Sequence, residues 1–227
     1  MLFIAKNEFF KLFKSIKSIL IILIFVLASY YTAKFFNGIT PLASMSNNES
    51  PYYSSLRLLV FIFGYLFISV LSHDCINKEI ELQTVRLITS KVSRKDFVLG
   101  KFLGITLFWF ICVISSSICI ILISKTIEIK IILVMLITCI YFISMVILVS
   151  TLVSKSSISN FLGIVLGIGI PLVGLYLMFT ENSFLKIFKY LFPYYYVVNM
   201  DLSVCVIGII AAVLLYISYF VLNRKDL

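Results

Sequence analysis

Long apolar windows dominate the chain, and short polar segments separate them. Six windows contain no Asp, Glu, Lys or Arg: 18–33, 58–72, 102–124, 131–154, 156–180 and 202–223. The last four are long enough to cross a hydrocarbon core of about 30 Å at about 1.5 Å per residue. The first two are shorter, but basic residues border them and can extend their aliphatic stems along the bilayer. The pattern predicts six spans at about 18–36, 55–73, 98–124, 130–154, 157–180 and 202–223.

The spans are predicted to be helices rather than strands. The windows are rich in Ile, Val and Phe, but their length and lack of alternation do not fit strands, and an isolated strand leaves its backbone unpaired in lipid. Composition agrees, since 62% of residues are hydrophobic and 13% are charged, against about 45–50% and about 25% in soluble domains. We therefore expect an all-α polytopic membrane protein, with residues 1–227 as a single transmembrane domain and no room for a soluble catalytic domain.

The basic residues predict the orientation. Six spans place thirteen of the 19 Lys and Arg residues on the side of the N-terminus and six on the other. Because cytoplasmic loops carry the excess of Lys and Arg, both termini are expected in the cytoplasm. The net charge of +9 then reflects topology and contact with anionic membrane lipid, not nucleic-acid binding.

The N-terminal segment is amphipathic. Five apolar residues recur at helical spacing, and three lysines fall largely on another face: Phe9, Leu12, Phe13, Ile16 and Leu20, against Lys11, Lys14 and Lys17. This pattern predicts an interfacial elbow helix at 3–17 that precedes the first span. The alternative is a plain basic flank that only sets the orientation.

The longest charged segment, residues 73–101, joins the second and third spans. Four apolar residues form a broken helical stripe there, and four charged residues are expected to face water: Ile76, Ile80, Leu87 and Ile88, against Lys78, Glu79, Glu81 and Arg86. A short amphipathic helix that projects into the cytoplasm would offer a partner protein an apolar face. The alternative is a solvated connector.

Residues 79–101 resemble the corresponding loop of the ATP-binding-cassette type-2 exporter permeases. In that family a Glu and a Gly-Thr pair precede an apolar turn, followed by Ser-Pro-Val-Ser-Arg and a Gly-Lys at the next span. The matching positions here are Glu79 or Glu81, Gln83-Thr84, Leu87-Ile88, residues 90–94 and Gly100-Lys101. The chain departs at Gln83, where Gly is usual, and at Lys91, where Pro is usual, which affects the expected turn geometry.

The resemblance implies a permease half whose cytoplasmic coupling helix, between spans two and three, enters a cleft on a separate ATPase subunit. The residues assigned to that interface are Lys78, Glu79, Glu81, Thr84, Arg86, Val92, Ser93 and Arg94. It also implies a second permease subunit, identical or related, and export from a bacterial cell of a hydrophobic or amphipathic substrate. Peptide antibiotics, toxins and lipophilic drugs are candidates, and self-immunity is the same activity. ATP and Mg²⁺ would be bound by the partner ATPase.

The chain carries no recognisable energy-coupling chemistry of its own. No G-x-x-x-x-G-K-[ST] phosphate-binding loop occurs, and the six windows hold no ionisable Asp, Glu, Lys or Arg through which an ion gradient could act. The single His73 beside Asp74, and the run Ser115 to Ser117, lack the partners that a metal site or a nucleophile requires. We expect no catalytic residue, no metal and no directly bound cofactor. A non-transport membrane scaffold or anchoring subunit is the alternative function.

Small residues and aromatic residues mark the later part of the chain. Gly163, Gly167, Gly169 and Pro171 place small residues and a kink in span five, and they are assigned to helix packing within the subunit or to a subunit interface. The stretch 183–197 is too polar for a span and is predicted to be a short outer interfacial or re-entrant helix, with Tyr194 to Tyr196 at the headgroup level.

Overall fold

Every span is helical in the computed structural model, which describes residues 1–38, 51–85, 90–180, 188–199 and 203–225. No strand occurs among these residues, and six helical segments are long and apolar enough to cross a membrane. They are Ile16–Phe35, Ser55–Glu81, Arg94–Ser124, Ile129–Leu152, Ser156–Phe179 and Val204–Arg224. The predicted all-α polytopic fold with six membrane-spanning helices is confirmed.

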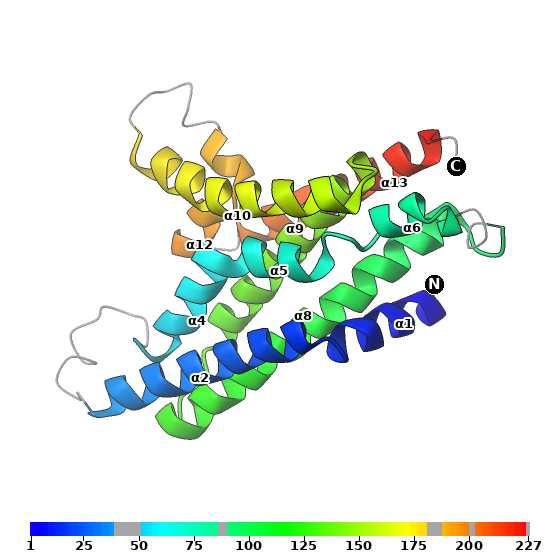
Figure 1. The fold of residues 1–227 in the computed structure, drawn as a ribbon. Helices are drawn as coiled ribbons and strands as arrows, with labels where there is room; N and C mark the ends of the chain where they lie inside the picture. The colour runs from blue at the N-terminus through cyan, green and yellow to red at the C-terminus, as the bar shows by residue number, and fades with distance from the viewer. Residues whose placement is uncertain (39–50, 86–89, 181–187, 200–202, 226–227) are drawn as a thin grey trace.

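A separate helix precedes the first span. α1 (Leu2–Phe13) ends before α2 (Ile16–Gly38) begins, and α1 packs along the first part of α8 (Arg94–Ser124), as Figure 1 shows. The buried residues of α1 are Ala5, Glu8 and Leu12, a stripe at helical spacing that includes a carboxylate. Most of the predicted apolar stripe points outward, since Phe13 is 47% and Ile16 is 82% exposed.

The second span is a composite of several helical pieces. η1 (Pro51–Tyr53) and α4 (Ser54–Leu58) lead into a π-helical turn, η2 (Leu59–Phe63), and then into α5 (Gly64–Ser72) and α6 (Asn77–Glu81). A π turn inserts one extra residue into the helical repeat. The face of the helix that packs inward therefore shifts between α4 and α5.

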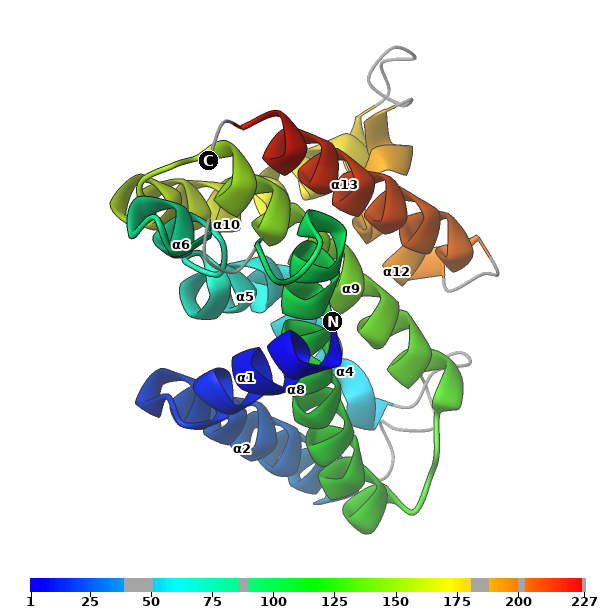
Figure 2. The same ribbon diagram turned by 90° about the vertical axis from the view of Figure 1, so that its right-hand side faces the viewer.

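α9 (Ile129–Leu152) is the central helix of the bundle. It packs against α5, α8 and α13 (Val204–Arg224), and 61% of its most apolar window is buried, against 22% for α13 and 28% for α2 (Figure 2). Aromatic contacts join neighbouring helices, with Trp109 against Phe25 and Tyr65 against Phe142 at ring-centroid distances of 5.8 and 5.9 Å. The apolar outer faces of α2, α13 and α10 (Ser156–Phe179) suit contact with lipid.

Both termini lie at the same end of the bundle as α6, whereas α12 (Tyr194–Asn199) lies at the other end (Figure 1). An even number of crossings requires this arrangement of the termini. Residues 183–187 of the predicted outer helix lie outside the described residues; η3 (Lys189–Leu191) and α12 follow them.

Of the tyrosines expected at the headgroup level, Tyr194 to Tyr196, two pack inside the subunit, namely Tyr194 and Tyr196. Both are buried, at 1% and 4% exposure. The Tyr194 ring packs against Phe61 at 4.5 Å and lies over Gly174 of α10. The absence of a side chain at Gly174 provides the space that the ring occupies.

Candidate functional site

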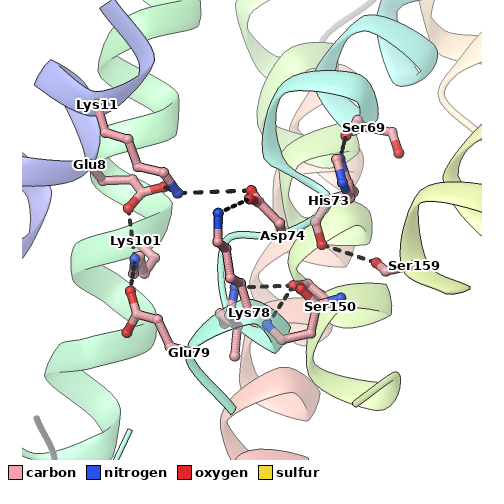
Figure 3. A network of polar contacts seen from close by, with 12 residues as sticks. Glu8, Lys11, Ser69, His73, Asp74, Lys78, Glu79, Lys101, Ser150 and Ser159 are labelled. Atoms are coloured by element: carbon pink, nitrogen blue, oxygen red, sulfur yellow. Dashed lines mark hydrogen bonds and ion pairs between the residues drawn. The ribbon is translucent and has the colours of Figure 1, made fainter. Parts of the chain in front are cut away.

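A chain of ion pairs crosses the end of the bundle that carries the termini. Six side chains of alternating charge follow one another: Lys78, Asp74, Lys11, Glu8, Lys101 and Glu79. The first three pairs have N–O distances of 3.7, 3.8 and 3.6 Å, and Lys101 Nζ lies 2.7 Å from Glu8 Oε2 and also contacts Glu79 Oε1 (Figure 3). This ion-pair chain joins α1, α8 and the segment around α6.

The end of the ion-pair chain around Lys101 is its most buried part. The side chains of Glu8, Lys101 and Glu79 are 4%, 6% and 23% exposed. Lys101 lies seven residues after the start of α8, about 10 Å along the helix axis. The expectation that Glu79 faces water is wrong, because a buried ammonium requires carboxylate partners and Glu79 turns toward Lys101 to supply one.

Two glycines of α8 allow α1 to come this close. A Cβ at Gly104 would lie 2.7 Å from the backbone oxygen of Ala5 and 2.8 Å from Glu8 Cβ, and one at Gly100 would lie 2.8 Å from Ile4 Cβ. Gly100-x-x-x-Gly104 is a small-residue spacing of the kind that permits close helix packing. Lys101, Glu8 and Gly104 were not among the predicted site residues, and this spacing is the sequence signal that indicates them.

The beginning of α6 is attached to α9 and α10. Ser150 Oγ of α9 accepts hydrogen bonds from the backbone amides of Ile76 and Asn77 at 3.1 and 3.2 Å. Ser159 Oγ of α10 donates to the backbone oxygen of His73 at 3.0 Å. His73 itself lies at the end of α5, with its Nδ1 3.2 Å from the backbone oxygen of Ser69, so it has a structural position.

The far end of α6 forms an exposed tip. Glu81 Oε2 accepts a hydrogen bond from Ser156 N, at the first residue of α10, at 3.1 Å. Beyond it, Leu82 is 62% exposed, and Gln83 has a left-handed backbone with φ 57°. Thr84 Oγ1 donates to the backbone oxygen of Glu79 at 3.2 Å, which closes the turn. Leu82, Gln83 and Thr84 are called the coupling tip below.

The predicted stripe of the loop is confirmed in its described part. Ile76 is fully buried and Ile80 packs partly buried against the core. Lys78 is half exposed and pairs with Asp74. Leu87, Ile88 and the assigned interface residue Arg86 lie outside the described residues.

Ser93 and Arg94 hold the start of α8 and the end of α13. Ser93 is the N-cap of α8, and its Oγ accepts from Asp96 N at 3.1 Å and donates to Asp96 Oδ2 at 2.8 Å. Arg94 Nη1 donates to the backbone oxygens of Leu222 and Asn223 at 3.0 and 2.8 Å. These carbonyls at a helix C-terminus have no partner within the helix, so Arg94 caps α13.

A cavity of about 430 Å³ lies between α1 and the first turns of α8. Its walls include Phe3, Val92 and Phe97, and its lining includes Glu8, Lys101 and Glu79 of the ion-pair chain. Glu79 Oε2 is buried and accepts no hydrogen bond from the described residues. Val92, which was assigned to the interface, is half-buried here.

The small residues of α10 face two different environments. A Cβ at Gly167 would lie 2.9 Å from Leu66 Cβ of α5, and Gly163 packs against Ser69 of the same helix. Gly169 faces open space, and Pro171 is buried within the helix. Gly163 and Gly167 thus pack within the subunit, while Gly169 does not.

The described residues contain no group of three or more His, Cys, Asp or Glu side chains that could hold a metal ion. The polar groups described above cap helices and pair charges.

Comparison with known proteins identifies the family. No curated protein matches the chain at a significant level. One family profile, described as "ABC-2 family transporter protein", matches residues 2–227. This family is made of membrane subunits that lack the ATPase. Since the match spans nearly the whole sequence, the chain belongs to the ABC-2 family of transporter proteins.

Proposed function

We propose that the chain is the permease subunit of an ATP-driven exporter and that a separate ATP-binding-cassette ATPase docks on the end that carries α6. Family membership supports a transporter permease that works with such a partner. On this proposal the ATPase binds ATP and Mg²⁺, and the permease converts movement of the ATPase into movement of its spans.

The ion-pair chain is the observation that carries the proposal. It joins α6 to α1 and to α8 through Lys101 and Glu8, which are buried, and Glu79, which is partly buried. Separating buried charges is costly, so a displacement of α6 moves α1 and α8 with it. α8 has 31 residues, a length of about 46 Å. A push at one end of this helix therefore reaches the opposite side of the membrane.

The coupling tip is the part of this segment that suits direct contact with the ATPase. Leu82 exposes most of its apolar side chain, and Lys78 is half exposed on the same short segment. An apolar side chain surrounded by polar groups is typical of a protein contact. By contrast, Glu79, Ser93 and Arg94 are occupied by partners within the subunit. They position the segment.

The orientation follows from this role. Docking of a cytoplasmic ATPase requires that α6 and both termini face the cytoplasm of the cell, as the distribution of Lys and Arg predicts. The protein would then be a multi-pass component of the bacterial cell membrane.

The apolar spans favour a hydrophobic or amphipathic substrate, such as a peptide antibiotic, a toxin or a lipophilic drug. One subunit with six helices forms half of a transport path, and a second permease subunit, identical or related, completes it. The outward apolar faces of α2 and α10 are available for lipid or for that second subunit.

The test is co-purification of the permease with its ATPase, followed by measurement of ATP turnover with candidate peptides. Leu82→Ser should release the ATPase without lowering the thermal stability of the permease. Leu133→Ser is the matched control, because Leu133 is 53% exposed and lies near the start of α9 at the opposite end. Equal retention of the ATPase by both variants contradicts the proposed docking site. A wild-type permease that binds no ATPase favours the scaffold function instead.

A further inference from the structure

A second cavity, of about 230 Å³, lies between the first turns of α8 and the last turns of α13. Two groups of side chains line it: Lys95, Val98 and Leu99 from α8, and Ala212, Leu215, Tyr216 and Tyr219 from α13. Tyr216 is 67% exposed, so the cavity opens on the outside of the bundle, where α13 forms one edge (Figure 2). We call it the α8–α13 groove.

The spacing of the lining residues makes this groove follow the two helices. Residues 95, 98 and 99 share one face of α8, and residues 212, 215, 216 and 219 share one face of α13. The stretch from Tyr219 to Ala212 covers about 10 Å of helix axis. Lys95, in the first turn of α8, lies at the end of the groove nearest the termini. The groove therefore has a cationic end and an apolar interior.

Lys95 differs from Arg94 and from the two basic residues at the end of α13. Arg94 donates to the carbonyls of α13, Lys225 Nζ lies 3.3 Å from the backbone oxygen of Leu152, and the Arg224 guanidinium lies 4.3 Å from the Phe220 ring centroid. Burial lowers the pKa of Lys225. Within the part of the chain that the structure describes, the Lys95 ammonium has no ion-pair or hydrogen-bond partner, so it is available to a ligand.

The surroundings of Lys95 suit an anion. The adjacent carboxylate of Asp96 is bound by the Ser93 hydroxyl. The carbonyls at the end of α13 would repel an anion, but Arg94 binds two of them. Tyr216 and Tyr219 each bring a hydroxyl that can donate a hydrogen bond to a phosphate or an ester oxygen.

We propose that the α8–α13 groove is a binding site for one phospholipid with an anionic headgroup. Its phosphate lies on Lys95, and one acyl chain lies along Val98, Leu99 and Ala212. The groove, at about 230 Å³, has room for part of a single flexible chain. This site is separate from the proposed coupling tip and does not depend on it.

The charge, rather than the apolar wall, makes the site selective. Lipid tails are as apolar as leucine, so an apolar groove in a membrane gains little over bulk lipid. One lysine near an anionic lipid contributes an attraction that corresponds to about fivefold enrichment. We therefore expect the groove to retain phosphatidylglycerol over phosphatidylcholine by about this factor.

The experiment measures the lipids that stay with the protein. The full chain is placed in nanodiscs of equal phosphatidylglycerol and phosphatidylcholine, extracted in mild detergent, and examined by native mass spectrometry. The wild type and Lys95→Arg should retain phosphatidylglycerol about fivefold over phosphatidylcholine. Lys95→Ala should remove the preference. Ala212→Phe, which fills the groove and keeps the charge, should lower the amount of lipid retained.

Lys130→Ala is the matched control, because Lys130 is an exposed lysine at the opposite end of the bundle. It should leave the preference unchanged. The proposal is overturned if Lys95→Ala keeps the preference, if Lys130→Ala loses it to the same extent, or if Ala212→Phe retains as much lipid as the wild type. Detection of a second protein chain instead of lipid, with the preference absent, also overturns it.

Discussion

Replacing Lys101 with Met tests the buried part of the ion-pair chain. Met keeps much of the aliphatic stem and removes the ammonium that lies between Glu8 and Glu79. Glu8 is 4% exposed and then retains, among the described residues, only Lys11 at 3.6 Å. Removing one partner of a buried ion pair costs about 3–5 kcal/mol. In a chain of this length the melting temperature falls by roughly 2–4 °C per kcal/mol, so we expect a loss of about 10 °C.

The two carboxylates should respond in a fixed order when each is changed alone. Glu8→Gln should cost more than Glu79→Gln, because water can partly solvate the charge left near Glu79, which is 23% exposed. The triple variant with Lys101→Met, Glu8→Gln and Glu79→Gln should recover most of the lost stability, since neutral replacement of a whole buried ion cluster is often close to neutral in free energy.

The assay is thermal unfolding of the purified permease in detergent, followed by intrinsic fluorescence, together with ATP turnover of the complex. The triple variant should be stable but poorly coupled, because its α6 is no longer tied to α1 and α8 by charge. Unfolding of Lys101→Met within about 2 °C of the wild type would refute the structural reasoning, as would a larger loss for Glu79→Gln than for Glu8→Gln.

Three further predictions concern single positions. Gly167→Ala should lower the free energy of unfolding by about 1–3 kcal/mol, because the added Cβ meets Leu66. Gly169 faces open space, so Gly169→Ala should raise the free energy of unfolding by about 0.5–1 kcal/mol. Thermal unfolding compares the two variants, and equal effects contradict the packing of Gly167 against Leu66. Gln83→Gly should stabilise by roughly 0.5–1 kcal/mol because φ is 57°, and the same assay with Gln83→Ala, expected to give no gain, checks this. Arg94→Ala should speed amide hydrogen exchange at the end of α13, which Arg94 caps, but not at the end of α10. An equal change in exchange rate at both helix ends contradicts the cap.

The topology could be predicted because it depends on local properties of the sequence. The composition of a window without charge is enough to show that its transfer into lipid is favourable. Because each backbone polar group needs a hydrogen-bond partner in lipid, such a window forms a helix. The burial of Ile76 and the partial burial of Ile80 also follow from local periodicity. The departure at Gln83 was expected to affect the turn geometry, and Gln83 has the left-handed backbone that favours glycine.

Lys101 could not be placed by the same reasoning. A charged residue beside an apolar window marks the boundary of a span only if the helix also starts at that residue. The apolar window starts after Lys101, but α8 begins seven residues earlier, at Arg94. Lys101 therefore lies inside a helix, and it is buried because α1 covers it. Its partner Glu8 is 93 positions away in the sequence. The sequence signal for this pair is Gly100-x-x-x-Gly104, which indicates that another helix packs closely against α8. It does not indicate which helix that is.

The internal contacts of the motif residues change how a loss of coupling has to be interpreted. Glu79 and Arg94 match the family's motif, yet their side chains bind Lys101 and the end of α13. A substitution at either position shifts the segment that carries the coupling tip, so loss of the ATPase there does not identify a contact. Leu82 is exposed, and a substitution there removes a surface without breaking an internal bond. Exposed positions such as Leu82 are therefore the ones that distinguish recognition of the partner from positioning of the segment.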